Sequence, residues 1–291
     1  MRANTLVACV AMLSLAACSS SNNTPTQAAA APAPTAGSEA PAAPATPEPP
    51  PAPPPPAGRV RVIHAAPVTS PNVDISVDGN SALQDVAYKA VHGYMPLPAG
   101  EHAVALRAAG NASGDPLLSA NVTVTADRFH TLIAHGTASG EPRLGVTALE
   151  DDRTAAPEGQ ARIRFFHALV GVAAVDLCVP GATARAAATP LFTNIAYGGT
   201  GAYANVPASA VTIQVRAQNA RACTGNVIGT VAVTPSAGLL ATAVAVGNVT
   251  ASPAVAPELL VCNDAEQSSC AAVPVQLAPA RSGARPAAPR R

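Results

Sequence analysis

The chain has 291 residues, of which 30 are Pro, and its 17 basic residues balance 17 acidic ones. Proteins that bind nucleic acids normally leave a basic footprint, so this neutral charge argues against DNA and RNA as partners. Glu, Lys and Leu are sparse whereas Val and Thr are common, which argues against a helical bundle. A chain of this length is predicted to form two domains.

Residues 1–17 resemble a secretory signal peptide. Arg2 supplies the positive start, and the apolar run over residues 6–17 is too short for a membrane-spanning helix, which needs roughly 20 residues. The run ends Leu-Ala-Ala-Cys, which resembles the lipobox of bacterial lipoproteins and predicts that Cys18 carries a membrane-anchoring lipid. Ser19 follows where Asp would signal inner-membrane retention, which favours the outer membrane, on its periplasmic or surface face. The alternative is an ordinary signal peptide with an incidental Cys.

Residues 18–58 form a predicted linker that is rich in Pro and Ala. Pro removes backbone donors and fixes φ, so neither helix nor sheet is expected, and residues 51–56 should form a polyproline II helix. The segment is interpreted as a spacer that holds a folded head away from the membrane. The alternative is a Pro-rich ligand for another protein, although no basic residue flanks the Pro run to orient such a contact.

The predicted folded part consists of two similar segments, 59–152 and 161–264, joined by residues 152–160. The sequence VRVIHA at 60–65 matches IRFFHA at 163–168, and VDISVDG at 73–79 matches VDLCVPG at 175–181. Such self-similarity indicates a duplicated module. The paired positions that we interpret as structural are His64 and His167, Asp74 and Asp176, Tyr88 and Tyr197, Tyr94 and Tyr203, and Arg107 and Arg216.

Within each segment, short runs of Val, Ile, Thr and Leu are separated by Gly, Pro, Asn or Asp. Residues 73–78 alternate between apolar and polar, which predicts a half-buried strand. About seven strands per segment predict an all-β fold of two tandem immunoglobulin-like β-sandwiches, with a small barrel as the alternative. Residues 265–291 return to Pro, Ala and Arg and are predicted to be a disordered tail. Its Arg residues would serve solubility or contact an anionic lipid or cell-wall polymer.

The repeated pattern resembles the bacterial family known as domain of unknown function 4397. The residues that carry the resemblance are Arg61 to Pro67, Val73 to Gly79, Ala87-Tyr88, Gly93-Tyr94, Pro98 to Gly100 and Leu149 to Asp152. The second segment departs from the pattern, because Ala208-Ser209 replaces Ala-Gly in a turn and a Cys stands in mid-strand. The resemblance implies tandem β-domains that are secreted or lipid-anchored. It implies no activity and no functional residues.

Four cysteines remain once the signal peptide and the predicted lipidation site are set aside, an even number for an oxidising compartment. Three pairings are possible, and we expect the disulfides Cys178–Cys223 and Cys262–Cys270. A zinc site would need CxxC-like pairs and a thioredoxin-type centre would need Cys-x-x-Cys, and these spacings supply neither.

The histidines make the best case for a catalytic or metal site. Most of them lie in the first segment: His64, His92, His102, His130 and His135. On one regular strand His130 and His135 would point to opposite faces, so they would not share a metal. A His that recurs in both segments also fits a buried side chain at a strand end, with Asp74 and Asp176 as possible acceptors.

No Gly-x-Ser-x-Gly elbow and no Gly-rich phosphate loop occur in the sequence, so we expect no catalytic residue, no metal and no cofactor. The acidic run over residues 150–152 is interpreted as a solvated turn before the joint, with a calcium site as the alternative.

The sequence therefore predicts a non-enzymatic lipoprotein of the cell envelope that presents two modules for binding or for a structural role. A cell-wall polymer, a glycan or an envelope protein would be its partner, besides the membrane. One alternative is a metal-dependent hydrolase that uses the first-segment histidines. Another is an accessory subunit of an envelope complex.

Overall fold

The computed structural model describes residues 55–67, 72–183, 185–264 and 269–278. The chain divides into two units, Met1–Ala52 and Pro53–Arg291, and all described residues lie in the second unit. The signal peptide, Cys18 and nearly all of the predicted linker therefore lie outside the described residues, as do residues 279–291 of the predicted tail.

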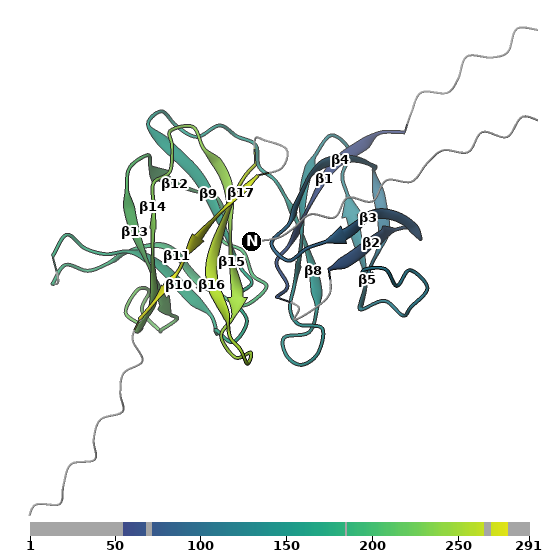
Figure 1. Cartoon of the computed structure of the whole chain (residues 1–291). Coiled ribbons are helices and arrows are strands. Elements are labelled where there is room, and N and C mark those ends of the chain that lie inside the picture. The colour runs from purple at the N-terminus through teal and green to yellow at the C-terminus, as the bar shows by residue number, and fades with distance from the viewer. Residues whose placement is uncertain (1–54, 68–71, 184, 265–268, 279–291) are drawn as a thin grey trace, which may run out of the picture. The chain divides into compact units, whose positions relative to one another are not determined.

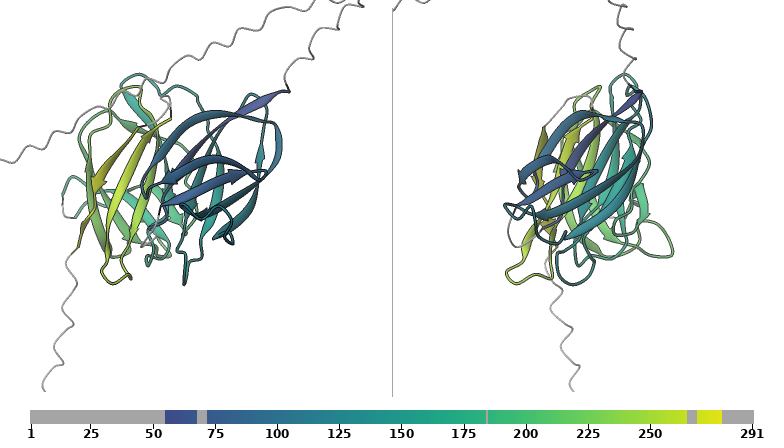
Figure 2. Two further views of the ribbon diagram at one scale, coloured as in Figure 1. Left: turned by 45° about the vertical axis from the view of Figure 1, so that its right-hand side comes forward. Right: turned by 90° about the vertical axis from the view of Figure 1, so that its right-hand side faces the viewer.

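The described residues form 18 strands in four sheets, and none of them is helical. Only arrows and connecting loops are seen in the coloured ribbon (Figures 1 and 2). The all-β prediction is confirmed. Within this part of the chain there is accordingly no helix of the length and apolarity needed to cross a membrane.

The first sandwich consists of eight strands, one more than the sequence predicted. They are β1 (Ala57–His64), β2 (Val73–Val77), β3 (Asn80–Val86), β4 (Val91–Pro98), β5 (Gly100–Ala108), β6 (Leu118–Val124), β7 (Phe129–His135) and β8 (Gly145–Glu150). One sheet has the order β4-β1-β7-β8 and the other β3-β2-β5-β6. The β1–β7 pair is parallel, and the remaining pairs are antiparallel. This distribution of strands differs from the ABED and CFG sheets of immunoglobulin constant domains, while the sandwich architecture is shared.

The second sandwich has the same strand order with one strand added to each sheet. Its strands are β9 (Gln160–His167), β10 (Val175–Val179), β11 (Thr189–Ile195), β12 (Ala204–Pro207), β13 (Val211–Ala217), β14 (Val227–Val233), β15 (Leu240–Asn248), β16 (Val255–Asn263), β17 (Cys270–Pro274) and β18 (Gln276–Leu277). The sheets run β12-β9-β15-β16-β17 and β11-β10-β13-β14-β18.

The two added strands correct the prediction of a disordered tail, which is wrong for residues 270–277. Strand β17 pairs with β16 and β18 pairs with β14, so this segment supplies an edge strand to each sheet. Val273 and Val275 pack against the core of the second sandwich. Pro274 is tolerated because an edge strand can leave one backbone donor out of the ladder. The high Pro and Ala content of this segment led to the prediction of disorder, whereas its two valines pack against the core.

Strands β1 and β9 are buried on both faces. They differ in this from the half-buried strand that the alternation over residues 73–78 predicts. In β1, Val60 and Val62 face the core of the first sandwich, whereas Ile63 belongs to a second cluster. That cluster combines residues of both sandwiches: Ile63, Ala65, Ile133, Leu149, Phe166, Ala168, Val244, Val246, Leu260 and Cys262. Strands covered on both faces read as nearly continuous apolar runs, as VIHAA and FFHALV do. The sheets that contain β1 and β9 therefore share an apolar core.

Candidate functional site

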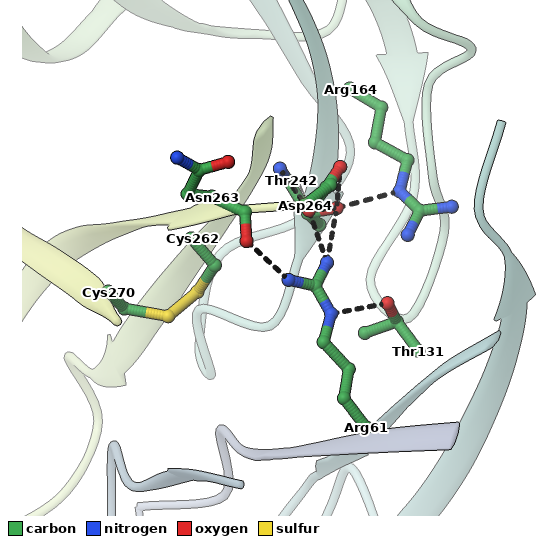
Figure 3. Close-up of a disulfide and its surroundings, with 8 residues drawn as sticks. All are labelled: Arg61, Thr131, Arg164, Thr242, Cys262, Asn263, Asp264 and Cys270. Carbon is green, nitrogen blue, oxygen red and sulfur yellow. Dashed lines mark hydrogen bonds and ion pairs between the residues drawn. A yellow bond between two sulfur atoms is a disulfide. The ribbon is translucent and has the colours of Figure 1, made fainter. Parts of the chain in front are cut away.

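The most unusual group of side chains lies where the two sandwiches meet. Arg61 of β1 is only 1% exposed, and its guanidinium forms an ion pair with Asp264, which follows β16 (Figure 3). Arg61 Nη1 also donates to the carbonyl oxygen of Asn263 at 3.1 Å. Its Nε donates to Thr131 Oγ1 at 2.7 Å, and its Nη2 to Thr242 Oγ1 at 3.1 Å. One arginine of the first sandwich thus bonds to three residues of the second.

Arg164 of β9 makes the reciprocal set of contacts. Its guanidinium pairs with Asp151, which follows β8 of the first sandwich. Arg164 Nη1 donates to the carbonyl oxygen of Glu150 at 2.9 Å, and Nε donates to Thr242 Oγ1 at 3.0 Å. Each sandwich therefore sends an arginine to the buried carboxylate of the other.

Both carboxylates have additional donors. Asp151 accepts the hydroxyl of Tyr94 at 2.6 Å and that of Thr131 at 2.7 Å. Asp264 accepts the hydroxyl of Tyr203 at 2.6 Å. Burial, with help from the neighbouring carboxylates, raises the pKa of both tyrosine hydroxyls, so each remains a neutral donor. A buried ion pair is tolerated only when its remaining hydrogen-bonding groups are satisfied, as they are here.

The arginines also lie over aromatic rings. The guanidinium carbon of Arg61 is 5.1 Å from the ring centroid of Tyr94, and that of Arg164 is 5.1 Å from the centroid of Tyr203. Burial disfavours the charge of Arg61, but Asp264 and the other neighbouring acidic groups outweigh it, so the pKa of Arg61 is raised. The cluster therefore places two buried ion pairs inside the apolar interface between the sandwiches.

The cluster is built from equivalent positions of the two segments. The equivalent pairs are Arg61 and Arg164, Tyr94 and Tyr203, Thr131 and Thr242, and Asp151 and Asp264. We predicted structural roles for the tyrosines, but sequence reasoning missed the arginine, threonine and aspartate pairs. A signal was present, because each aspartate stands two residues after equivalent positions, Leu149 and Cys262.

The interpretation of residues 150–152 as a solvated turn is wrong for Asp151, which is 6% exposed and paired with Arg164. Asp152 pairs instead with Arg162 at the joint between the segments. The calcium alternative also fails here, because these carboxylates point to different arginines. Across the described ranges, no three His, Cys, Asp or Glu side chains are grouped as metal ligands would be.

The repeated histidines are fully buried, at 0% exposure for His64 and 1% for His167. Asp74 and Asp176 do not accept bonds from them, so that suggestion was wrong. Asp74 accepts the backbone amides of Asp85 at 2.9 Å and Gly110 at 3.0 Å.

Asp176 likewise accepts the amides of Asn194 at 2.8 Å and Cys223 at 2.9 Å. These aspartates hold loops, because a carboxylate can accept from two amides at once. His167 Nε2 lies 3.0 Å from the carbonyl oxygen of Ala173.

Aromatic rings surround these histidines at the interface. His64 packs edge-on against Tyr88, with ring centroids 6.4 Å apart. Tyr197 lies between His167 and His135, at 5.7 and 5.5 Å. Burial raises the pKa of Tyr197 to about 12. These tyrosines therefore fill the interface between the sandwiches.

Acidification is expected to destabilise the protein through His64. Its two ring nitrogens have no hydrogen-bond partner among the described residues, and burial lowers the pKa of His64 to about 4 from 6.5. The unfolded chain then binds more protons between these values, so the free energy of unfolding falls as pH drops from 6.5 towards 4, by roughly 3 kcal/mol. Urea unfolding at several pH values would measure this loss, and His64→Phe should remove much of it.

His102 provides a control with the opposite sign. Its hydrogen bond with Asp78 at 2.6 Å raises the pKa of His102, so this histidine contributes stability that is present at low pH. His102→Gln should therefore steepen the loss on acidification. A His64→Phe variant whose pH dependence equals that of the parent would show that His64 is not the acid-sensitive group.

Arg107 and Arg216, which the sequence also predicts to be structural, each hold a loop of their own sandwich. Arg107 Nε donates to the carbonyl oxygen of Gly114 at 3.0 Å, and Arg216 Nη1 donates to that of Gly225 at 2.9 Å. The structure contains the expected disulfides, Cys178–Cys223 and Cys262–Cys270.

Together these features define a protein of two β-sandwiches with the same strand order, joined by reciprocal buried ion pairs and a shared apolar core. Residues 58–178, from β1 into β10, match the family described as "Domain of unknown function (DUF4397)", which confirms the resemblance over that segment. No curated protein matches the chain.

Proposed function

We propose that this protein is a non-enzymatic lipoprotein of the cell envelope whose two β-sandwiches form one head for binding or for a structural role. The reciprocal cluster of Arg61, Asp264, Arg164 and Asp151 supports the single head, and the Leu-Ala-Ala-Cys sequence that ends at Cys18 supports the lipid anchor. The residues of the cluster hold the two sandwiches together, and their charged groups form hydrogen bonds with other residues of the cluster. A joined head holds two module surfaces at a fixed spacing, which favours simultaneous contact with one extended partner.

The anchor is tested at Cys18. With a radiolabelled palmitate precursor, the parent protein should be labelled and should fractionate with membranes, whereas Cys18→Ala should carry no label, because thioether attachment needs the Cys sulfur. Cys9→Ala is the matched control and should be labelled normally, since the cleaved signal peptide would contain it. A labelled Cys18→Ala protein would overturn the lipoprotein assignment.

The face of the envelope is tested by protease treatment of intact cells. Release of peptides from residues 59–264 without lysis would place the head outside and direct the search to matrix and external glycans. Release only after the outer membrane is opened would place it in the periplasm, where peptidoglycan and envelope assemblies are the partners to test by crosslinking.

A further inference from the structure

The second sandwich contains an apolar cavity of about 660 Å³ between its two sheets. Its floor is made by buried side chains from both sheets, among them Phe165, Leu177, Phe192, Ile213 and Leu259. Protein interiors normally leave few voids larger than a water molecule. Sites for small molecules typically enclose 300–1,000 Å³, so this cavity has the size of a ligand site.

The lining also has the polarity of a ligand site. The polar residues of the lining are mainly exposed ones, namely Thr189, Asn205, Thr234, Ser236 and Ser269. All of these side chains are uncharged, and no Asp, Glu, Lys, Arg or His contributes to the lining. An ionised group would lose its hydration there without gaining a counter-charge. The cavity therefore complements an uncharged molecule with a hydrocarbon body and a neutral polar end.

The first sandwich has a smaller hollow at the corresponding place. Its corresponding hollow measures only about 200 Å³, below the usual size of a ligand site. Thr131 and Thr242 are equivalent, so the next residues, Leu132 and Ala243, are equivalent too, and each lines its hollow. Ala243 lacks most of the side chain that Leu132 has at this position, whereas its ladder partner Phe165 is larger than the equivalent Val62, so the two sandwiches divide this space differently.

One wall of the cavity belongs to a strand that only the second sandwich has. Ala271 and Val273 of β17 line the cavity, and the disulfide Cys262–Cys270 ties β17 to β16. The extra strand, which this disulfide ties to β16, therefore extends the cavity wall with residues that the first sandwich lacks.

We propose that this cavity binds an uncharged ligand with a hydrocarbon chain, such as the acyl or alkyl chain of a neutral lipid or of a free fatty alcohol. The proposal rests on the cavity alone and does not depend on lipidation of Cys18. Only the second sandwich would then bind this small ligand, whereas the outer surfaces of both sandwiches would remain available to a larger partner.

The test uses the uncharged dye N-phenyl-1-naphthylamine and full-length chains synthesised under oxidising conditions without membranes or detergent. The parent should bind one dye with enhanced fluorescence. Ala243→Leu, which restores the side chain of the first sandwich, should raise the dissociation constant by about tenfold or more. Ala272→Leu is the matched control, because Ala272 lies on β17 but not in the lining, and its affinity should equal that of the parent.

Competition identifies the chemistry of the ligand. Hexadecanol and 1-palmitoylglycerol should both displace the dye, and the stronger of the two indicates a free chain or a lipid as the source. Palmitate at neutral pH, which has the same chain with an ionised head, should compete at least about tenfold more weakly. Equal competition by palmitate would overturn the preference for an uncharged ligand.

A second measurement does not depend on how the variants fold. Hexadecanol with a diazirine on its chain should, on irradiation of the parent protein, attach to peptides of β9–β17 that line the cavity. Attachment confined to other peptides would overturn the proposal, as would equal dye affinity in Ala243→Leu and Ala272→Leu. Either failure would leave the lipoprotein assignment standing, because Cys18 labelling is measured separately.

Discussion

Arg61→Met is expected to lower the free energy of unfolding by about 3–5 kcal/mol, because it leaves a buried carboxylate without its cation. Asp264 has an exposed fraction of 0% and pairs directly with Arg61. The variant also leaves the carbonyl oxygen of Asn263 and the hydroxyl of Thr131 without this donor. Urea unfolding, with the slope compared between variants, would measure the loss.

An exposed ion pair provides the control. Arg128 and Glu150 are 3.7 Å apart, with side chains 63% and 52% exposed, so Arg128→Met should cost less than about 1 kcal/mol. Asp264→Asn in the Arg61→Met background should recover part of the loss, because it removes the unpaired charge. If Arg61→Met cost no more than Arg128→Met, the buried cluster would not hold the sandwiches together.

Removing the Cys178–Cys223 disulfide is expected to cost about 4 kcal/mol, since it frees a long loop in the unfolded chain. The two cysteines are 45 residues apart, whereas Cys262 and Cys270 are 8 apart. Cys178→Ala with Cys223→Ala should therefore be the more destabilising double variant, and the shorter bridge should contribute about 2.5 kcal/mol.

The order of these two effects is the informative result. Denaturant unfolding of both double variants and of the reduced parent would show whether the loss of stability follows the length of the loop that each disulfide closes. A larger loss for the Cys262 and Cys270 variant would mean that holding β17 on β16 matters more than chain entropy. In that case dye binding in the cavity should fall together with stability, because Ala271 and Val273 line it.

The stability of the interface between the sandwiches also bears on the proposed function. The ion pairs link residues that belong to different sandwiches, so their loss should separate the modules before either one unfolds. If the head contacts an extended partner through both modules, Arg61→Met should weaken that contact more than it weakens either module alone.

The sequence by itself determined the local features of the fold. The alternation from Val73 to Asp78 predicted strand β2, in which Val73 and Ile75 face the core. Strand patterns of period two depend on neighbouring residues only, so one sequence suffices to read them. The repeat and the number of cysteines that remain to pair can also be read from one sequence, because both depend on residue identity and not on the fold.

Tertiary structure alone decided which partners the charged residues have. Arg61 and Asp264 are 203 residues apart, and nothing in the local pattern of either one indicates the other. The double burial of β1 and the edge strands β17 and β18 also depend on surfaces that exist only after the sheets have formed. Ala243 is an ordinary strand residue in the sequence. It marks a cavity only when the ladders place it opposite Phe165, at the position that Leu132 fills in the first sandwich.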